Sequence, residues 1–153
     1  MYKPAKNPTA DAFVKQARAR EHAHLVPTDE SGVRQVFRTL KQGGITAILP
    51  DHTPTHGGDL IQWFGVPLYS SQLTAKLIQK TQSTALVVYA IRNSNSGFDI
   101  YIEPLSTCIE NSEHGTLLIH QTIEQLIQRH PAHYHWSYKR FKANPQTHNL
   151  YDI

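Results

Sequence analysis

The stretch from residue 45 to residue 65 constrains the fold most, because a short apolar run ends there abruptly at a proline. Ile45–Leu49 is mostly apolar and is stopped by Pro50, which predicts a buried strand. Asp51 and His52 follow at once, and a turn-rich loop continues as far as residue 65. Ligands of open α/β sheets bind just beyond the carboxyl ends of strands, so an acid and an imidazole here predict a site. The alternative is that Asp51 only caps a turn and that His52 is a solvated loop residue.

Hydrophobic periodicity predicts the remaining elements. The clearest amphipathic helix follows Ser31, a good N-cap, and ends at two glycines. A later strand is apolar on both faces, as central buried strands are, and the strictly alternating strand after it pairs back as a hairpin. We expect helices over 9–21, 31–42, 70–80 and 113–129, and strands over 45–49, 84–91 and 98–103. This order predicts an α/β fold with a mainly parallel sheet, flanking helices and one antiparallel hairpin.

Composition narrows the function classes. The 153 residues suit one domain, with residues 143–153 as a polar tail. Lys and Arg number 15 against 12 Asp and Glu, and the net charge of +3 is far from a nucleic-acid signature. A single cysteine excludes an intramolecular disulfide and fits a reducing compartment. We find neither an apolar run of about 18 residues nor the apolar core of a signal peptide.

Several cations are candidate ligands for an anion. Arg18 and Arg20 lie at the end of the first predicted helix, where they either bind an anion or merely complement the helix dipole. Arg92 ends the strand over 84–91, and the predicted sheet places it at the same edge as Asp51. With His52, it is a candidate substrate ligand.

The segment over 130–142 interleaves aromatic and basic residues. It includes Arg140 and Lys142. Such a mixture can stack on bases, or lie at a membrane interface where cations meet lipid phosphates. In the simplest interpretation, the aromatic side chains pack on the sheet and the cations point outward.

Two further patterns give weaker candidates. His24 and Asp29 fit an H-x4-D pattern, in which a histidine base is oriented by a carboxylate, but Pro27 between them disfavours the usual geometry. Two H-x-H pairs, at 22/24 and 133/135, have no third ligand nearby, so we predict no metal site. Neither a G-x-S-x-G elbow nor a cysteine signature supports covalent catalysis.

Three stretches together resemble the lipid A biosynthesis acyltransferases. Leu49–Pro67, LPDHTPTHGGDLIQWFGVP, is similar to that family's proline–aspartate loop. Tyr2–Arg20 resembles its Y-R-P…N-P…R segment, and Ile123–Lys142 resembles its closing segment. The order and spacing agree over nearly the whole chain, and the resemblance is to the C-terminal half of the enzyme.

The resemblance implies an activity. The family transfers a fatty acyl chain, usually from acyl carrier protein, to a hydroxyl of a lipid A precursor at the cytoplasmic face of the inner membrane. It implies a sheet like that of glycerol-phosphate acyltransferases and no cofactor. Independently of the resemblance, we expect no nucleic-acid partner, because the net charge is only +3 and no nucleic-acid motif precedes the segment over 130–142. Arg20 is expected to assist catalysis, with Arg18 as a neighbouring ligand. Asp51 matches the loop aspartate, and Arg140 and Lys142 match the basic end near lipid phosphates.

The resemblance also implies what lies outside these residues. The family's H-x4-[DE] general base and its N-terminal membrane helix precede the segment that matches Tyr2, so His24 and Asp29 are not that motif. We therefore expect a partial chain, incomplete at the N-terminus, with an open sheet edge. The alternative function is a catalytically inactive module that binds anionic lipid or acyl carrier protein.

Overall fold

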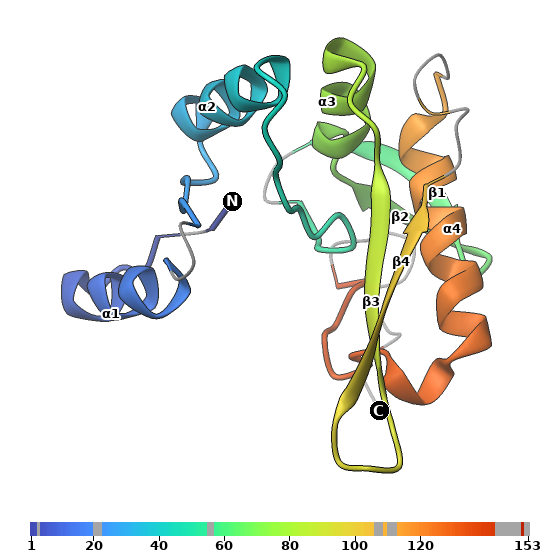
Figure 1. The fold of residues 1–153 in the computed structure, drawn as a ribbon. Coiled ribbons are helices and arrows are strands. Elements are labelled where there is room, and N and C mark those ends of the chain that lie inside the picture. The colour runs from blue at the N-terminus through green and yellow to red at the C-terminus, as the bar shows by residue number, and fades with distance from the viewer. Residues whose placement is uncertain are drawn as a thin grey trace. The chain divides into compact units, whose positions relative to one another are not determined.

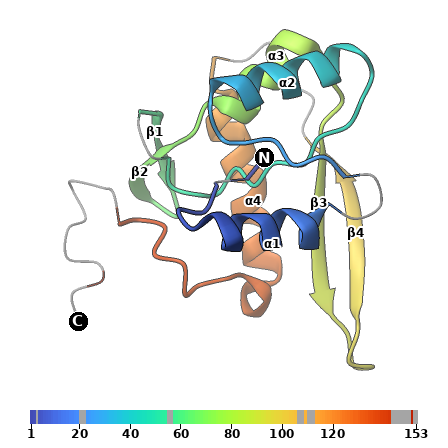
Figure 2. The same ribbon diagram turned by 90° about the vertical axis from the view of Figure 1, so that its left-hand side faces the viewer.

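The structure is a computed structural model that describes residues 1–2, 4–19, 23–54, 57–105, 109, 113–142 and 151. The chain forms two compact units, Met1–Ile48 and Leu49–Ile153. Figures 1 and 2 show the ribbon from two directions, with the first unit coloured blue to teal.

The first unit contains two helices, α1 (Pro8–Arg18) and α2 (Glu30–Lys41). Asp29, rather than the predicted Ser31, caps α2, because its side chain accepts a hydrogen bond from the Gly32 backbone N–H. The segment before α2 is held by a parallel bridge between Tyr2 and Pro27. Both helices confirm the predicted elements to within a few residues, although α1 buries no residue and its Phe13 is 71% exposed.

The predicted strand over 45–49 is wrong. These residues are not assigned to a strand, and the side chains of Ile45 and Leu49 are 94% and 73% exposed. A strand needs a hydrogen-bonding partner, and the run has none among the described residues. The boundary between the two units also falls within this run, after Ile48. Asp51 therefore lies in a turn rather than at the end of a strand.

The second unit begins with a hairpin that the sequence interpretation assigned to a loop. β1 (Asp59–Trp63) pairs antiparallel with β2 (Val66–Ser70). The two residues between the strands, Phe64 and Gly65, have φ angles of 50° and 72°. Two consecutive positive φ values are typical of the tight turns whose twist matches that of the strands.

The rest of the second unit is a helix, a second hairpin, a long helix and a short 3-10 turn. These are α3 (Leu73–Thr81), β3 (Leu86–Arg92), β4 (Phe98–Pro104), α4 (Gly115–Arg129) and η2 (Pro131–His133). β3 and β4 pair antiparallel over their full length, which confirms the predicted hairpin. The described strands form two separate antiparallel pairs, so the mainly parallel sheet is not found in this part of the chain. β3 was also expected to be buried on both faces, but its alternate residues are exposed.

Helix α4 joins the two parts of the core. One cluster of buried residues consists of Ala75, Ile78, Leu105, Ile109 and Ile119, and the other of Ile61, Trp63, Leu68 and Ile127. Ile123 packs against both clusters, so one face of α4 spans them as its apolar spacing predicts. Burying a large apolar side chain contributes about 1.5–3 kcal/mol, so this face fixes α4 against β1 and α3 (Figure 1).

Candidate functional site

The loop after Pro50 and the segment after η2 come together in the second unit. The Tyr134 hydroxyl donates a 3.1 Å hydrogen bond to the Asp51 carboxylate. Burial raises the pKa of Tyr134, and the Asp51 charge raises this pKa further. Tyr134 therefore stays protonated and remains a donor to Asp51 at neutral pH.

Tyr138 contacts the two residues that follow Asp51 in the same loop, His52 and Thr53. Its hydroxyl accepts a 3.0 Å hydrogen bond from the Thr53 backbone N–H, and the Thr53 hydroxyl donates to the Arg140 carbonyl at 3.1 Å. The His52 ring lies 4.9 Å from the Tyr138 ring between centroids, and the Lys142 ammonium lies 4.9 Å from the same ring centroid. His52 and Lys142 are both exposed, so two cationic or titratable side chains gather beside one aromatic ring.

Arg140 is buried directly beneath this loop. Its side chain donates to the Ser70 hydroxyl at 2.8 Å and to the Tyr69 carbonyl at 3.1 Å. Its guanidinium carbon lies 5.6 Å from the Trp63 ring centroid, and the residue is only 2% exposed. Burial lowers the pKa of Arg140. The neighbouring Tyr138, Tyr134 and Asp51 act in the opposite direction and raise this pKa. The predicted contact of Arg140 with lipid phosphate stays a prediction, while its observed contacts hold the end of β2.

A buried hydroxyl–imidazole pair adjoins Arg140 and was not predicted from the sequence. Ser70 Oγ and His120 Nε2 lie 2.6 Å apart, and His120 Nδ1 lies 2.9 Å from the Thr116 carbonyl. A carbonyl only accepts, so Nδ1 carries the proton and the Ser70 hydroxyl donates to Nε2. Burial lowers the pKa of His120, which keeps the ring neutral beside the Arg140 charge.

The signal for this pair was present in the sequence. His120 follows Leu117 by three residues and precedes Ile123 by three, so it lies within the apolar face of the predicted helix. A histidine in such a face must find a polar partner. The partner, Ser70, was missed because β2 was missed.

Arg92, another predicted ligand, makes its observed contact elsewhere in the second unit. Arg92 ends β3, and its guanidinium lies 4.7 Å from the Phe98 ring centroid within the hairpin. The expectation of a shared sheet edge with Asp51 depended on the strand over 45–49, which does not form.

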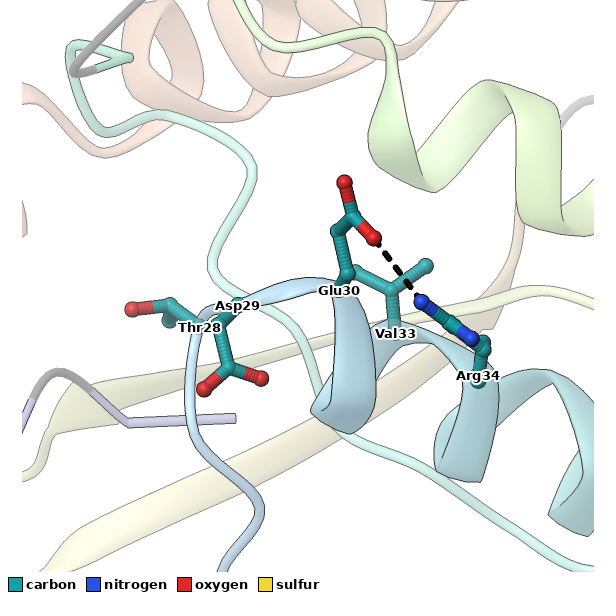
Figure 3. A pocket seen from close by; sticks show the side chains of 5 residues that line it. All are labelled: Thr28, Asp29, Glu30, Val33 and Arg34. Atoms are coloured by element: carbon teal, nitrogen blue, oxygen red, sulfur yellow. Dashed lines mark hydrogen bonds and ion pairs between the residues drawn. The ribbon is translucent and has the colours of Figure 1, made fainter.

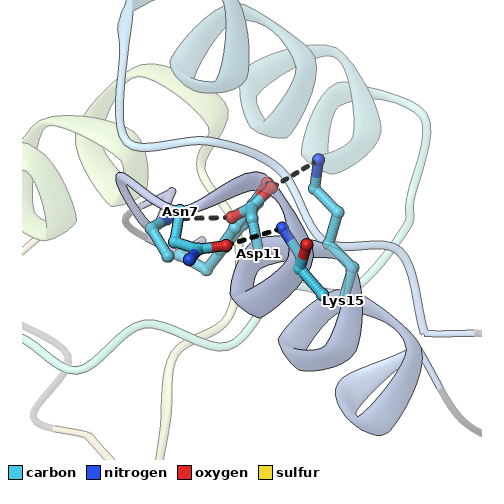
Figure 4. Close-up of polar contacts among 6 residues, drawn as sticks. Asn7, Asp11 and Lys15 are labelled. Carbon is cyan, nitrogen blue, oxygen red and sulfur yellow. Dashed lines mark hydrogen bonds and ion pairs between the residues drawn. The ribbon is translucent and has the colours of Figure 1, made fainter.

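Arg18 belongs to the first unit, in the last turn of α1. Figure 4 shows how the start of that helix is fixed: Asn7 caps its first turn, and Asp11 forms a 2.9 Å ion pair with Lys15. Arg20 lies outside the described residues.

A pocket of about 660 Å³ lies at the start of α2, lined by Thr28, Asp29, Glu30, Val33 and Arg34 (Figure 3). Its charged groups already have partners, because Glu30 pairs with Arg34 at 2.8 Å and Asp29 accepts from Ser31. Hydrogen bonds from Ser31 and the Gly32 backbone lower the pKa of Asp29. The contacts of Asp29 are those of a helix cap, so they give no support to a catalytic pair with His24.

The described residues contain no group of three or more His, Cys, Asp or Glu side chains arranged to hold a metal ion. Among these same residues, no helix combines the length and the apolar character needed to cross a membrane.

Comparison with known proteins identifies the family. Residues 1–143 match the bacterial lipid A biosynthesis acyltransferases. The chain is 21% identical to the lipid A biosynthesis lauroyltransferase of Escherichia coli over 151 residues, which cover 95% of this chain and 49% of that protein. It is 25% identical to a lipid A biosynthesis acyltransferase of Haemophilus influenzae over 160 residues, which cover 99% of this chain and 51% of that protein. The chain thus spans about half the length of these relatives, and it belongs to the bacterial lipid A biosynthesis acyltransferase family.

Proposed function

We propose that these residues form the acceptor-binding part of an acyltransferase that moves a fatty acyl chain from acyl carrier protein to a hydroxyl of a lipid A precursor. The proposal includes action at the cytoplasmic face of the inner membrane and a complete sheet like that of glycerol-phosphate acyltransferases. Its support begins with family membership, which makes lipid A acyl transfer the general role.

The observation that carries the proposal is the joining of the Asp51 loop to the segment over 134–142. The two segments are more than 80 residues apart in sequence, yet Tyr134 binds Asp51 and Tyr138 binds Thr53. Both segments are ones on which the family resemblance rests. A site built from remote segments and held by partly buried hydrogen bonds is what a binding site requires of its scaffold.

The charges of this constellation suit a phosphorylated acceptor. Lys142 and His52 are exposed beside Tyr138, where they can reach a phosphate, and a lysine acts there as a point charge. Arg140 is buried and acts as a positioning residue that ties the loop to β2. Asp51, held by Tyr134, is then available to orient a hydroxyl. We assign Arg20 and Arg18 to the same reaction on the resemblance alone, together with a general base outside these residues.

Binding of a lipid A precursor in vesicles tests the acceptor site. A lysine near an anionic surface contributes about 1 kcal/mol, so Lys142→Ala should weaken binding by about fivefold. Lys80→Ala is the matched control, since it removes the same charge from an exposed position in α3 and should leave the affinity unchanged. Equal effects of both substitutions, or no binding by the parent chain, would contradict the acceptor site.

Acyl transfer from an acyl carrier protein thioester, followed by mass spectrometry, tests the reaction. We expect no turnover by the 153-residue chain alone and transfer when the unmatched half of a relative is supplied. Turnover by the chain alone that His24→Ala abolishes would make HLVPTD the catalytic motif. The second candidate function is a module that only binds anionic lipid or carrier protein, and it is considered because the chain spans about half the length of its relatives. Binding without transfer, even when the unmatched half is supplied, would favour this module.

A further inference from the structure

One face of the β3–β4 hairpin is apolar and uncovered. Leu86, Val88, Phe98, Ile100 and Ile102 are each between 56% and 68% exposed. The register pairs Val88 with Ile102 and Ala90 with Ile100, so these side chains form one continuous face. An antiparallel pair with one face in solvent normally carries polar residues there, so this pattern is that of a sheet covered on both sides.

The second unit covers the β3 side of the opposite face with its own residues, while Tyr101 of β4 on that face stays 43% exposed. Val87 packs against the buried cluster of Ile78 and Ile119, and Tyr89 lies near His130 at the end of α4. Helices α3 and α4 both contribute to that core. In Figure 1 the turn of the hairpin extends past the C-terminal end of α4.

We propose that the uncovered β3–β4 face docks the half of the family's chain that these 153 residues do not match. The relatives are about twice as long as the matched region, so a segment of comparable size exists in the family to cover this face. The apolar run Ile45–Leu49, which forms no strand, also leaves the side chains of Ile45 and Leu49 exposed. The occupant is therefore a layer that packs on β3–β4 through aliphatic side chains. The inference does not depend on the reaction proposed above, because docking is measured without substrate.

Thiol accessibility tests the docking. The chain is prepared with Cys108→Ser and a single new thiol at Val88→Cys, both alone and fused ahead of residue 1 to the unmatched half of the Haemophilus influenzae relative. We expect maleimide to react at least tenfold more slowly at this thiol in the fused chain. Leu60→Cys, an exposed apolar position in β1, is the matched control and should react equally in both.

Three results would overturn the proposal. The first is an equal rate at Val88→Cys in both chains. The second is protection in the short chain that grows with its concentration, which would make the occupant a second copy. The third is protection of the short chain by vesicles without protection in the fused chain, which would make it a lipid surface.

A charged pair gives an independent measurement. Val88→Lys with Ile102→Glu should leave the thermal midpoint of the short chain unchanged, because both side chains are exposed there and the two opposite charges lie directly across the strands from each other. The same pair should lower the midpoint of the fused chain, where the face is covered. An equal lowering of the thermal midpoint in both chains would mean that the face is already packed in the short chain, and it would overturn the proposal.

Discussion

The Tyr134 hydroxyl donates a 3.1 Å hydrogen bond to the Asp51 carboxylate across 83 residues of sequence. The bond links the loop that follows Pro50 to the segment that follows η2, and Tyr134 also packs against the buried cluster around Trp63. One side chain therefore joins the hydrophobic core to the candidate site, so perturbing its protonation should perturb both.

Stability should fall at alkaline pH because of Tyr134. Its pKa is raised in the folded state from an ordinary value of 10.0, chiefly by burial and then by Asp51. Above pH 10 the unfolded chain loses this proton while the folded chain keeps it, so the free energy of unfolding falls as pH rises. Urea unfolding between pH 8 and about pH 11 measures the slope, and Tyr134→Phe should flatten it. Tyr69→Phe, at an exposed tyrosine, should keep the parent slope.

Stability should also fall at acid pH because of His120. Burial lowers its folded pKa below the ordinary 6.5, so the unfolded chain binds a proton that the folded chain does not. The contribution of neutral His120 to the free energy of unfolding is fully present above pH 6.5. It is lost as the pH falls from 6.5 through the lowered folded pKa. His120→Gln should reduce this slope in urea unfolding from pH 7.5 to pH 5. His24→Gln serves as the exposed control, and an effect as large at His24 would contradict the assignment.

Loss of Arg140 should destabilise the second unit. Hydrogen bonds to a charged group contribute about 1.5–3 kcal/mol each, and part of this is offset by the cost of burying the guanidinium. We expect Arg140→Met to lower the free energy of unfolding by about 2–4 kcal/mol, because the Tyr69 carbonyl and Ser70 lose their donor. Lys142→Met, at an exposed position, should change it by less than about 0.5 kcal/mol in the same urea titration. An unchanged free energy of unfolding in Arg140→Met would mean that the guanidinium does not hold β2.

The helices and one hairpin could be predicted because their signals are local. Helix α2 has its apolar positions at helical spacing, and β4 alternates strictly, so periods of 3.6 and 2 identified both. Ile45–Leu49 has equally strong local character, but whether it becomes a strand depends on a partner elsewhere. The sequence of a single segment does not contain that information.

The site was predicted only in part, for the same reason. Asp51 was a candidate because of its motif, and the aromatic side chains of the segment over 130–142 were expected to pack on the sheet. The pair of Ser70 and His120 was missed because it joins a strand to a helix 50 residues away. The β1–β2 hairpin was obscured by its turn, since Phe64 is an unusual residue at a positive φ.

Gly58 should be the least replaceable glycine of the loop that leads into β1. Its φ is +122°, and a Cβ at this position would lie 2.5 Å from the Ser70 carbonyl oxygen, which is backbone and cannot move aside cheaply. Gly65 also has a positive φ, +72°, but a Cβ there would meet nothing within 4 Å. Gly65→Ala therefore isolates the backbone strain, about 1–2 kcal/mol, and Gly58→Ala adds a clash to it. We expect Gly58→Ala to lower the free energy of unfolding by at least about 1 kcal/mol more than Gly65→Ala. Equal losses in urea unfolding would show that the approach of Gly58 to Ser70 does not constrain the end of β2.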